Sequence, residues 1–102
     1  MDNQTFHSML DDFMQCIEDA VDAADLDTDC EISSGVLTIT CPDRSVIIFS
    51  RQEPTHQLWL AAKSGGFHFT YDGVWRCTRS GRTVSDYFSD ITAQQCGIAI
   101  QI

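Results

Sequence analysis

Residues 36–51 read VLTITCPDRSVIIFSR and contain two β-strand patterns separated by a turn. Apolar and polar side chains alternate in the first pattern, which places Leu37 and Ile39 on the same face of a strand. The Pro-Asp-Arg sequence at 42–44 is typical of a turn, and the second strand runs from Val46 to Arg51. Short strands joined by a turn pair in antiparallel fashion, so we expect this stretch to form a β-hairpin.

Further short strands are expected on the C-terminal side of this hairpin. The alternation returns from Gln57 to Ala61, and Gly65-Gly66 break the chain before a strand at Phe67 to Phe69. A turn at Tyr71 to Gly73 then precedes a strand at Val74 to Cys77. Together these patterns predict an antiparallel meander of five to six strands.

A first amphipathic helix is expected before the sheet. From Phe6 to Ala24 the apolar residues recur at steps of three and four, the period of one helix face, and Asp2 or Asn3 can cap its start. These apolar positions are Phe6, Leu10, Phe13, Ile17, Ala20, Val21 and Ala24.

A second amphipathic helix is expected after the sheet. Thr83 and Asp86 have the spacing of a capping box, and Gly97 is a typical helix terminator. The apolar positions between them are Val84, Tyr87, Phe88 and Ile91. The apolar tail that follows, residues 97–102, is expected to pack between the two helices.

These elements predict one α+β domain over residues 1–102, a two-layer sandwich with both helices on one face of the antiparallel sheet. The other face of the sheet is then open. Because Leu58 and Leu60 are expected to point toward the helices, Gln57 and Trp59 are predicted on the open face. An indole exposed on a sheet is a candidate anchor for a partner protein.

The composition narrows the class of protein. A hydrophobic fraction of 43% without a long apolar run is typical of a soluble globular protein with no membrane span. The first ten residues, MDNQTFHSML, resemble neither a secretory signal nor a transit peptide, so we expect a bacterial-type cytoplasmic protein. A net charge of −9 repels phosphate backbones, which makes nucleic acids poor partners.

The five cysteines form no recognisable motif. No two of them are closer than eleven positions, and a C-x-x-C pair is absent, which argues against a structural zinc site. We expect five free thiols in a reducing compartment, most of them small apolar fillers.

Negative charge is concentrated in the first part of the chain. Residues 1–43 hold eleven acidic residues and no Lys or Arg, whereas residues 44–102 hold four acids and six bases. Solvated helix faces usually mix both signs, because opposite charges four positions apart stabilise a helix and like charges destabilise it. The polar face of the first predicted helix carries His7, Asp11, Asp12, Glu18, Asp19 and Asp22. The residues alone leave two interpretations open, a functional carboxylate surface and a merely solvated helix face.

The densest acidic stretch, DAADLDTDCE, is not a calcium-binding EF-hand loop. Asp25, Asp27 and Asp29 have the spacing of its first three ligands, but Cys30 and Val36 stand where that loop needs glycine and glutamate. Carboxylates on an open surface are hard ligands for Fe²⁺, Fe³⁺, Mn²⁺, Mg²⁺ or Ca²⁺ and discriminate poorly among them. We expect cation binding that is weak, multiple and salt-sensitive.

His7 and Asp11 lie one helical turn apart near the start of the same face. They could supply a mixed nitrogen and oxygen site with a better affinity for transition metals. Alternatively, His7 is a surface histidine paired electrostatically with Asp11. The sequence leaves both interpretations open.

Five short segments of this chain also form a recognisable set. They are Cys30-Glu31, GVLTI at 35–39, RQEPTHQLWLA at 51–61, GGFHF at 65–69 and RSG at 79–81. Together they resemble the frataxin family, in its bacterial CyaY type, and the likeness extends from Phe6 to Gln95. The helix, antiparallel sheet and terminal helix of that family agree with the fold predicted above.

The resemblance implies specific site residues. An acidic ridge in this family binds metal and partner proteins, and Glu18, Asp19 and Asp22 match its helical core. Asp25, Asp27, Asp29 and Glu31 occupy the helix end and the strand that prolong the ridge. His7 corresponds to a histidine near the start of the helix, and Gln57 and Trp59 match residues that frataxins present to the scaffold protein.

The resemblance also implies a function. It indicates an iron-binding regulator of iron–sulfur cluster assembly, not an enzyme, that docks on the cysteine desulfurase and scaffold complex. Iron, as Fe²⁺ or Fe³⁺, would be bound weakly and exchangeably, with other divalent cations able to substitute. We expect a monomer that can form oligomers when metal is added. Iron donation or storage, and weak ferroxidase activity at the same carboxylates, are the alternatives.

Overall fold

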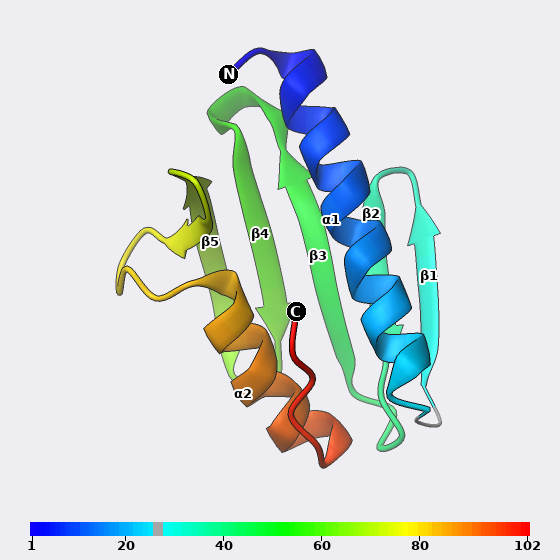
Figure 1. Cartoon of the computed structure of the whole chain (residues 1–102). Coiled ribbons are helices and arrows are strands. Elements are labelled where there is room, and N and C mark those ends of the chain that lie inside the picture. The colour runs from blue at the N-terminus through cyan, green and yellow to red at the C-terminus, as the bar shows by residue number, and fades with distance from the viewer. Residues whose placement is uncertain (26–27) are drawn as a thin grey trace.

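The computed structural model describes residues 1–25 and 28–102, which form two α-helices and a six-stranded antiparallel sheet (Figure 1). In chain order the elements are α1 (Asn3–Ala23), β1 (Asp29–Ser33), β2 (Val36–Thr40), β3 (Val46–Gln52), the 3-10 helix η1 (Glu53–Thr55), β4 (Gln57–Ala62), β5 (Gly65–Tyr71), β6 (Trp75–Cys77) and α2 (Val84–Cys96). Each strand pairs with its neighbours in sequence, in the order β1-β2-β3-β4-β5-β6. The predicted two-layer α+β sandwich is confirmed.

The hairpin of β2 and β3 forms as predicted, and its register fixes the two faces of the sheet. Leu37 pairs with Phe49, and both side chains are buried beneath the helices. In the turn, the Asp43 carboxylate accepts a hydrogen bond from the Ser45 backbone N–H at 2.9 Å. Arg44 takes a left-handed conformation with φ of 71°, which lets the chain reverse within a few residues.

The start of β5 differs from the prediction, whereas the ends of the other predicted strands agree within one residue. The break expected at Gly65-Gly66 lies at Lys63-Ser64, and both glycines belong to β5, where Gly66 pairs with Ala61. Gly65 has φ of 136°, a conformation that residues with a side chain rarely adopt. Glycine at this position therefore lets the strand begin directly after a tight turn, and the glycine pair marks the start of a strand.

The buried stripe of α1 is slightly rotated from the predicted one. The Asp2 carboxylate caps the helix by accepting a hydrogen bond from the Thr5 backbone N–H at 2.7 Å. The buried residues are Phe6, Leu10, Met14, Ile17 and Val21. Met14 replaces the predicted Phe13 in this stripe; both positions fit the three- and four-residue steps between Leu10 and Ile17, so the period alone does not decide between them. Phe13 lies half-buried at the edge of the stripe, with its ring 5.5 Å from that of Phe49.

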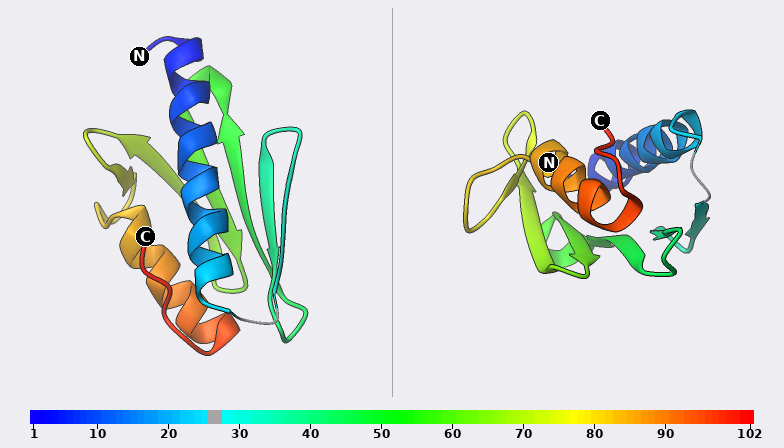
Figure 2. Two further views of the ribbon diagram at one scale, coloured as in Figure 1. Left: turned by 45° about the vertical axis from the view of Figure 1, so that its right-hand side comes forward. Right: turned by 90° about the horizontal axis from the view of Figure 1, so that it is seen from below.

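The second helix and the tail complete the same layer. The Thr83 hydroxyl accepts a hydrogen bond from the Asp86 backbone N–H, and Gly97 ends α2 with φ of 84°, as predicted. The C-terminal tail lies between α1 and α2, and both helices cover one face of the sheet (Figure 2). Ile100 of the tail is buried, and its N–H donates to the Thr92 hydroxyl at 2.8 Å. In residues 1–25 and 28–102, no helix has the length and apolarity required to cross a membrane.

Phe49 is central to the core, and its truncation tests the packing. The side chain is fully buried, and its ring lies 5.7 Å from that of Phe88. Phe49→Ala should lower the free energy of unfolding by about 3–5 kcal/mol, because it removes apolar contacts and leaves a cavity. Val46 is 41% exposed on the same strand, so the control Val46→Ala should change this free energy by about 1 kcal/mol or less. Urea denaturation followed by circular dichroism measures both; equal losses would contradict this placement of the core.

Candidate functional site

The candidate site is a row of carboxylates along the outer side of α1 and the edge strand β1, which we name the acidic ridge. Its described members are Glu18, Asp19, Asp22, Asp25, Asp29 and Glu31. Asp27, which was predicted to belong to it, lies outside the described residues. In the part of the chain that the structure describes, no Lys or Arg forms an ion pair with any of these six carboxylates.

The helical part of the acidic ridge lies at an electrostatically unfavourable place. Glu18, Asp19 and Asp22 occupy the C-terminal half of α1, whose last turn contains no basic residue. A helix C-terminus carries a partial negative charge, so carboxylates near it destabilise the helix by a few tenths of a kcal/mol each. Asp25 follows in a left-handed conformation with φ of 52°, and its N–H donates to the Asp22 carbonyl at 3.1 Å. Only Asp19 receives a side-chain hydrogen bond within the described chain, from the Gln15 amide at 3.0 Å.

The carboxylates of the strand part of the acidic ridge point away from the helix layer. Asp29 pairs with Thr40 and Glu31 with Thr38, while Cys30 pairs with the buried Ile39. Because side chains alternate along a strand, Cys30 faces α1 and the two carboxylates face the open side of the sheet. The acidic ridge therefore wraps around the β1 edge from the helix layer to the open face.

The charges of the helical carboxylates act on the thiol of Cys30. Burial, together with the negative charges of Glu18 and Asp22, raises the pKa of its thiol to about 11. This places the Cys30 sulfur within the electrostatic field of these two side chains. Glu18 and Asp22 therefore lie near Cys30 of β1.

The acidic ridge is open and does not enclose a cation. Among the described residues, no three His, Cys, Asp or Glu side chains are close enough to hold one metal ion together. An ion on this surface would be held by one or two carboxylates and would keep most of its water ligands. Such a surface favours weak and exchangeable binding of hard cations.

His7 and Asp11 lie close together, but Arg51 of β3 fills the space between them. The Arg51 guanidinium donates to Asp11 Oδ1 at 2.9 Å and lies 3.0 Å from His7 Nδ1. On its other side, His7 Nε2 contacts the Glu53 carboxylate at 2.5 Å. The simple pairing of His7 with Asp11 is thus replaced by a four-residue network, and a cation could enter only by displacing Arg51. Sequence patterns could not reveal this contact, because 40 positions separate Asp11 from Arg51.

A second candidate surface lies on the open face of the sheet. Leu58 and Leu60 are buried toward the helices, which places Trp59 on the opposite face as predicted. The Trp59 ring stacks on His68 of β5 at 4.3 Å between centroids, with 11° between the planes. Its Nε1 donates to the Gln57 side chain at 2.9 Å. The indole is therefore held in one orientation and is only half-buried.

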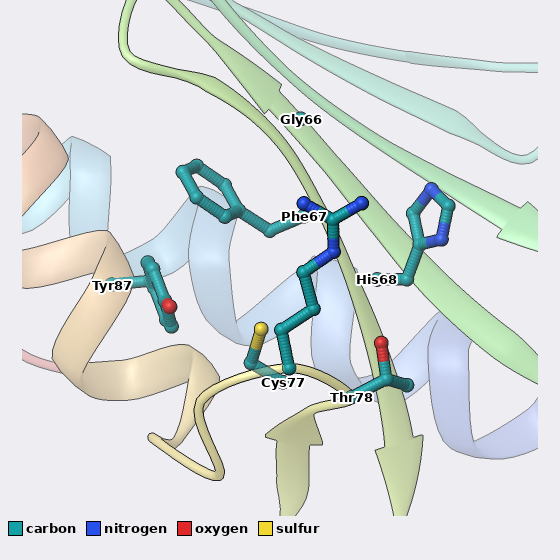
Figure 3. Close-up of a pocket in the computed structure, with 7 residues that line it drawn as sticks. Gly66, Phe67, His68, Cys77, Thr78 and Tyr87 are labelled. Carbon is teal, nitrogen blue, oxygen red and sulfur yellow. The ribbon is translucent and has the colours of Figure 1, made fainter.

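Sequence reasoning missed a small pocket on the other side of β5. Phe67, His68, Cys77 and Tyr87 are among the residues that line this cavity of about 190 Å³, and the Phe67 and His68 side chains extend to opposite sides of β5 (Figure 3). Burial alone would raise the pKa of the Cys77 thiol. Hydrogen bonds from the Ser80 and Arg79 N–H groups and from the Ser80 and Tyr87 hydroxyls outweigh it and lower the pKa to about 7. No sequence motif marks Cys77, because these donors come from a loop and from α2.

Comparison with known proteins identifies close relatives of this chain. A family model of the frataxin-like domain matches residues 1–98. The chain is 47% identical to the iron-sulfur cluster assembly protein CyaY of Azotobacter vinelandii over 95 residues, covering 90% of this chain and 86% of that protein. It is 50% identical to the protein of the same name from Pseudomonas syringae pv. tomato, with the same coverage.

Solved structures show the same fold. Frataxin from Psychromonas ingrahamii superposes with a TM-score of 0.92 at 27% identity, covering 99% of this chain and 97% of that one. The trimeric frataxin of the yeast Saccharomyces cerevisiae, described as complexed with ferrous, superposes with a TM-score of 0.75 at 25% identity, covering 86% and 85% of the two chains.

Cys30 offers a probe for cations on the helical part of the acidic ridge. A cation bound near Glu18 and Asp22 would cancel their field, lower the pKa of Cys30 and increase its thiolate fraction. We expect Mn²⁺ to accelerate alkylation of Cys30 by iodoacetamide about threefold or more, because a fall of half a pKa unit has this effect. Site-resolved mass spectrometry measures the rate, with the exposed Cys16 as an internal reference.

Two controls make this test specific. Sodium chloride at matched ionic strength should produce a smaller change, and Glu18→Gln with Asp22→Asn should remove the Mn²⁺ effect. An unchanged Cys30 to Cys16 rate ratio in Mn²⁺ would show that no cation binds at these two carboxylates.

Proposed function

The chain belongs to the frataxin family, and on this premise we propose that it is an iron-binding regulator of iron–sulfur cluster assembly. In this proposal it docks on a cysteine desulfurase and scaffold complex through the acidic ridge. Relatives that are about half identical to it are named as iron–sulfur cluster assembly proteins. The observation that carries the proposal is the row of six ridge carboxylates, for which the described part of the chain provides no cation.

The electrostatics of the acidic ridge favour binding to a basic partner. Like charges near a helix C-terminus destabilise this fold, and a basic surface that covers them relieves the repulsion. Long-range attraction of this kind accelerates association and weakens when salt screens the charges. Docking should therefore be salt-sensitive, with Glu18, Asp19 and Asp22 at its centre.

Iron would act on the same surface. Ferrous or ferric ions held by one or two carboxylates remain exchangeable and reduce the negative charge of the acidic ridge. Because docking depends on that charge, bound iron would change the affinity for the partner. Iron would then regulate docking in addition to being carried by the protein. The affinity for the partner would respond to the iron concentration without a closed metal site.

The open face of the sheet would supply the second contact. Trp59 is oriented by Gln57 and His68, and a half-buried aromatic side chain of this kind is a typical anchor for a partner protein. We assign this surface to the scaffold protein and the helical part of the acidic ridge to the cysteine desulfurase.

Iron donation or storage is the second candidate function. A yeast relative with the same fold is described in complex with ferrous, and the open position of the acidic ridge suits release of a bound ion. Metal-induced oligomers of a monomeric protein would be compatible with this function. Ferroxidase activity is less well supported, because dedicated di-iron sites enclose the metal among several helices. The acidic ridge carries its carboxylates on one helix and one edge strand.

Reversing charge on the helical part of the acidic ridge tests the docking proposal. Glu18→Lys with Asp22→Lys should weaken binding to a cysteine desulfurase by about a hundredfold or more, because like charges then face each other. Isothermal titration calorimetry at low and high salt, with and without anaerobic Fe²⁺, measures the affinity.

The matched control moves the same amount of charge elsewhere. Asp72→Lys with Asp86→Lys replaces two exposed acids of the β5–β6 turn and of α2, and it should change the affinity less than about threefold. Equal losses in both double variants would indicate an effect of net charge alone. Full affinity of the ridge variant would exclude docking through Glu18 and Asp22 and leave the donor function as the next to test.

Trp59→Ala tests the second surface independently. Removal of an oriented aromatic anchor typically costs about 2 kcal/mol or more of binding free energy, so binding to the scaffold protein should weaken about 30-fold. Binding to the isolated desulfurase should stay unchanged. Biolayer interferometry with each partner measures both affinities, and an equal loss toward both would contradict the assignment of separate surfaces.

A further inference from the structure

Two cysteines that are far apart in the sequence meet at one end of the molecule. Cys41 follows β2, Cys96 is the last residue of α2, and their sulfur atoms lie 3.3 Å apart. The turn after β2 and the C-terminal end of α2 lie together at the lower end of the molecule in Figure 1. Of the five cysteines, all within the described residues, only these two have sulfur atoms in hydrogen-bond contact with each other.

The surrounding hydrogen bonds hold this pair in place. Gln95 is 6% exposed, and its amide nitrogen lies 3.8 Å from the Cys41 sulfur and 2.9 Å from the Ser45 hydroxyl. Its carbonyl oxygen accepts a hydrogen bond from the Lys63 N–H at 3.0 Å. The Cys41 N–H donates to the Ser45 carbonyl at 2.8 Å. The Gln95 side chain thus links the β2–β3 turn and the β4–β5 turn to the end of α2 by hydrogen bonds, next to the two sulfur atoms.

From this geometry we propose that Cys41 and Cys96 form a reversible intramolecular disulfide when a small-molecule disulfide, such as oxidised glutathione, is in excess. Formation of the bond requires the sulfur atoms to approach from 3.3 Å to about 2.05 Å. The bond would tie the end of α2 and the attached tail to the sheet. It requires no part of the acidic ridge and no iron.

The exchange reaction has a definite order. Cys96 is partly exposed and Cys41 is buried, so a deprotonated Cys96 attacks oxidised glutathione first. This step forms a mixed disulfide and releases one glutathione thiolate. Cys41 then attacks the Cys96 sulfur, the disulfide of the protein forms, and the second glutathione leaves. The two protein thiols lose two protons and two electrons, and the two glutathione sulfur atoms gain the electrons.

The rate of this reaction should depend strongly on pH. Burial, the hydrogen bond with Cys41 and the nearby negative charge of Asp43 together raise the pKa of the Cys96 thiol to about 12. Only a small fraction is thiolate at neutral pH, so exchange is slow there and becomes faster as the pH rises.

The test uses the full chain in glutathione buffers with an increasing fraction of oxidised glutathione. The samples are incubated at pH 8.5 until thiol–disulfide exchange reaches equilibrium. We expect a product in which a peptide containing Cys41 is linked to a peptide containing Cys96, identified by mass spectrometry without reduction. When no other cysteine carries glutathione, this species has two fewer free thiols than the reduced chain, which has five. Its melting temperature should be higher by about 10 °C or more, because the crosslink closes a long loop.

Single variants make the result decisive. Cys96→Ser replaces a partly exposed side chain and should keep the fold, lose the linked peptide and lose the rise in melting temperature. Cys16→Ser, at an exposed position on α1, should retain both. Absence of the linked peptide over the whole range of buffers, or an unchanged rise in melting temperature in Cys96→Ser, would overturn the proposal.

Discussion

The packing of the α1 stripe across the sheet is the constraint on which the rest of the structure depends. Five buried side chains of this helix share one core cluster with buried side chains of β2, β3 and β4, and this packing fixes the rotation of the helix about its axis. Once that rotation is fixed, the carboxylates of α1 have to face outward. The acidic ridge is therefore a direct consequence of core packing, and rotation of one helix by a single residue would bury charge.

The same constraint explains why the acidic ridge is both unfavourable and persistent. Removal of the carboxylates from the C-terminal half of α1 would relieve repulsion and an adverse helix dipole, with little effect on the buried stripe. A chain selected for stability alone would carry Lys or Arg in this region. The described residues instead place their cations elsewhere: Arg51, Lys63, Arg76 and Arg82 each pair with an acid outside the acidic ridge.

Most of the fold could be predicted from the sequence because it depends on local periodicity. The two helices with their caps, the β2–β3 hairpin and the position of Trp59 follow from spacing and from turn chemistry. The position of Arg51, the contact of Cys41 with Cys96 and the opposite orientations of Glu18 and Glu31 depend on strand register and on residues that are distant in sequence. No local pattern encodes these features. The glycine pair at 65–66 was misread because a break and a strand start have the same local composition.

The geometry of the acidic ridge divides its carboxylates between two surfaces. Asp29 and Glu31 share the open face of the sheet with Trp59, and β1 is three strands away from β4, a distance of about 14 Å at the usual strand spacing. A typical interface covers about 800 Å² per partner, which is wide enough to include both positions. Glu18 and Asp22 lie on the other side of the β1 edge and stay outside such an interface. A partner on the open face therefore leaves Glu18 and Asp22 uncovered, so under the proposed function a scaffold protein on that face would not compete for these two carboxylates with iron or with a desulfurase.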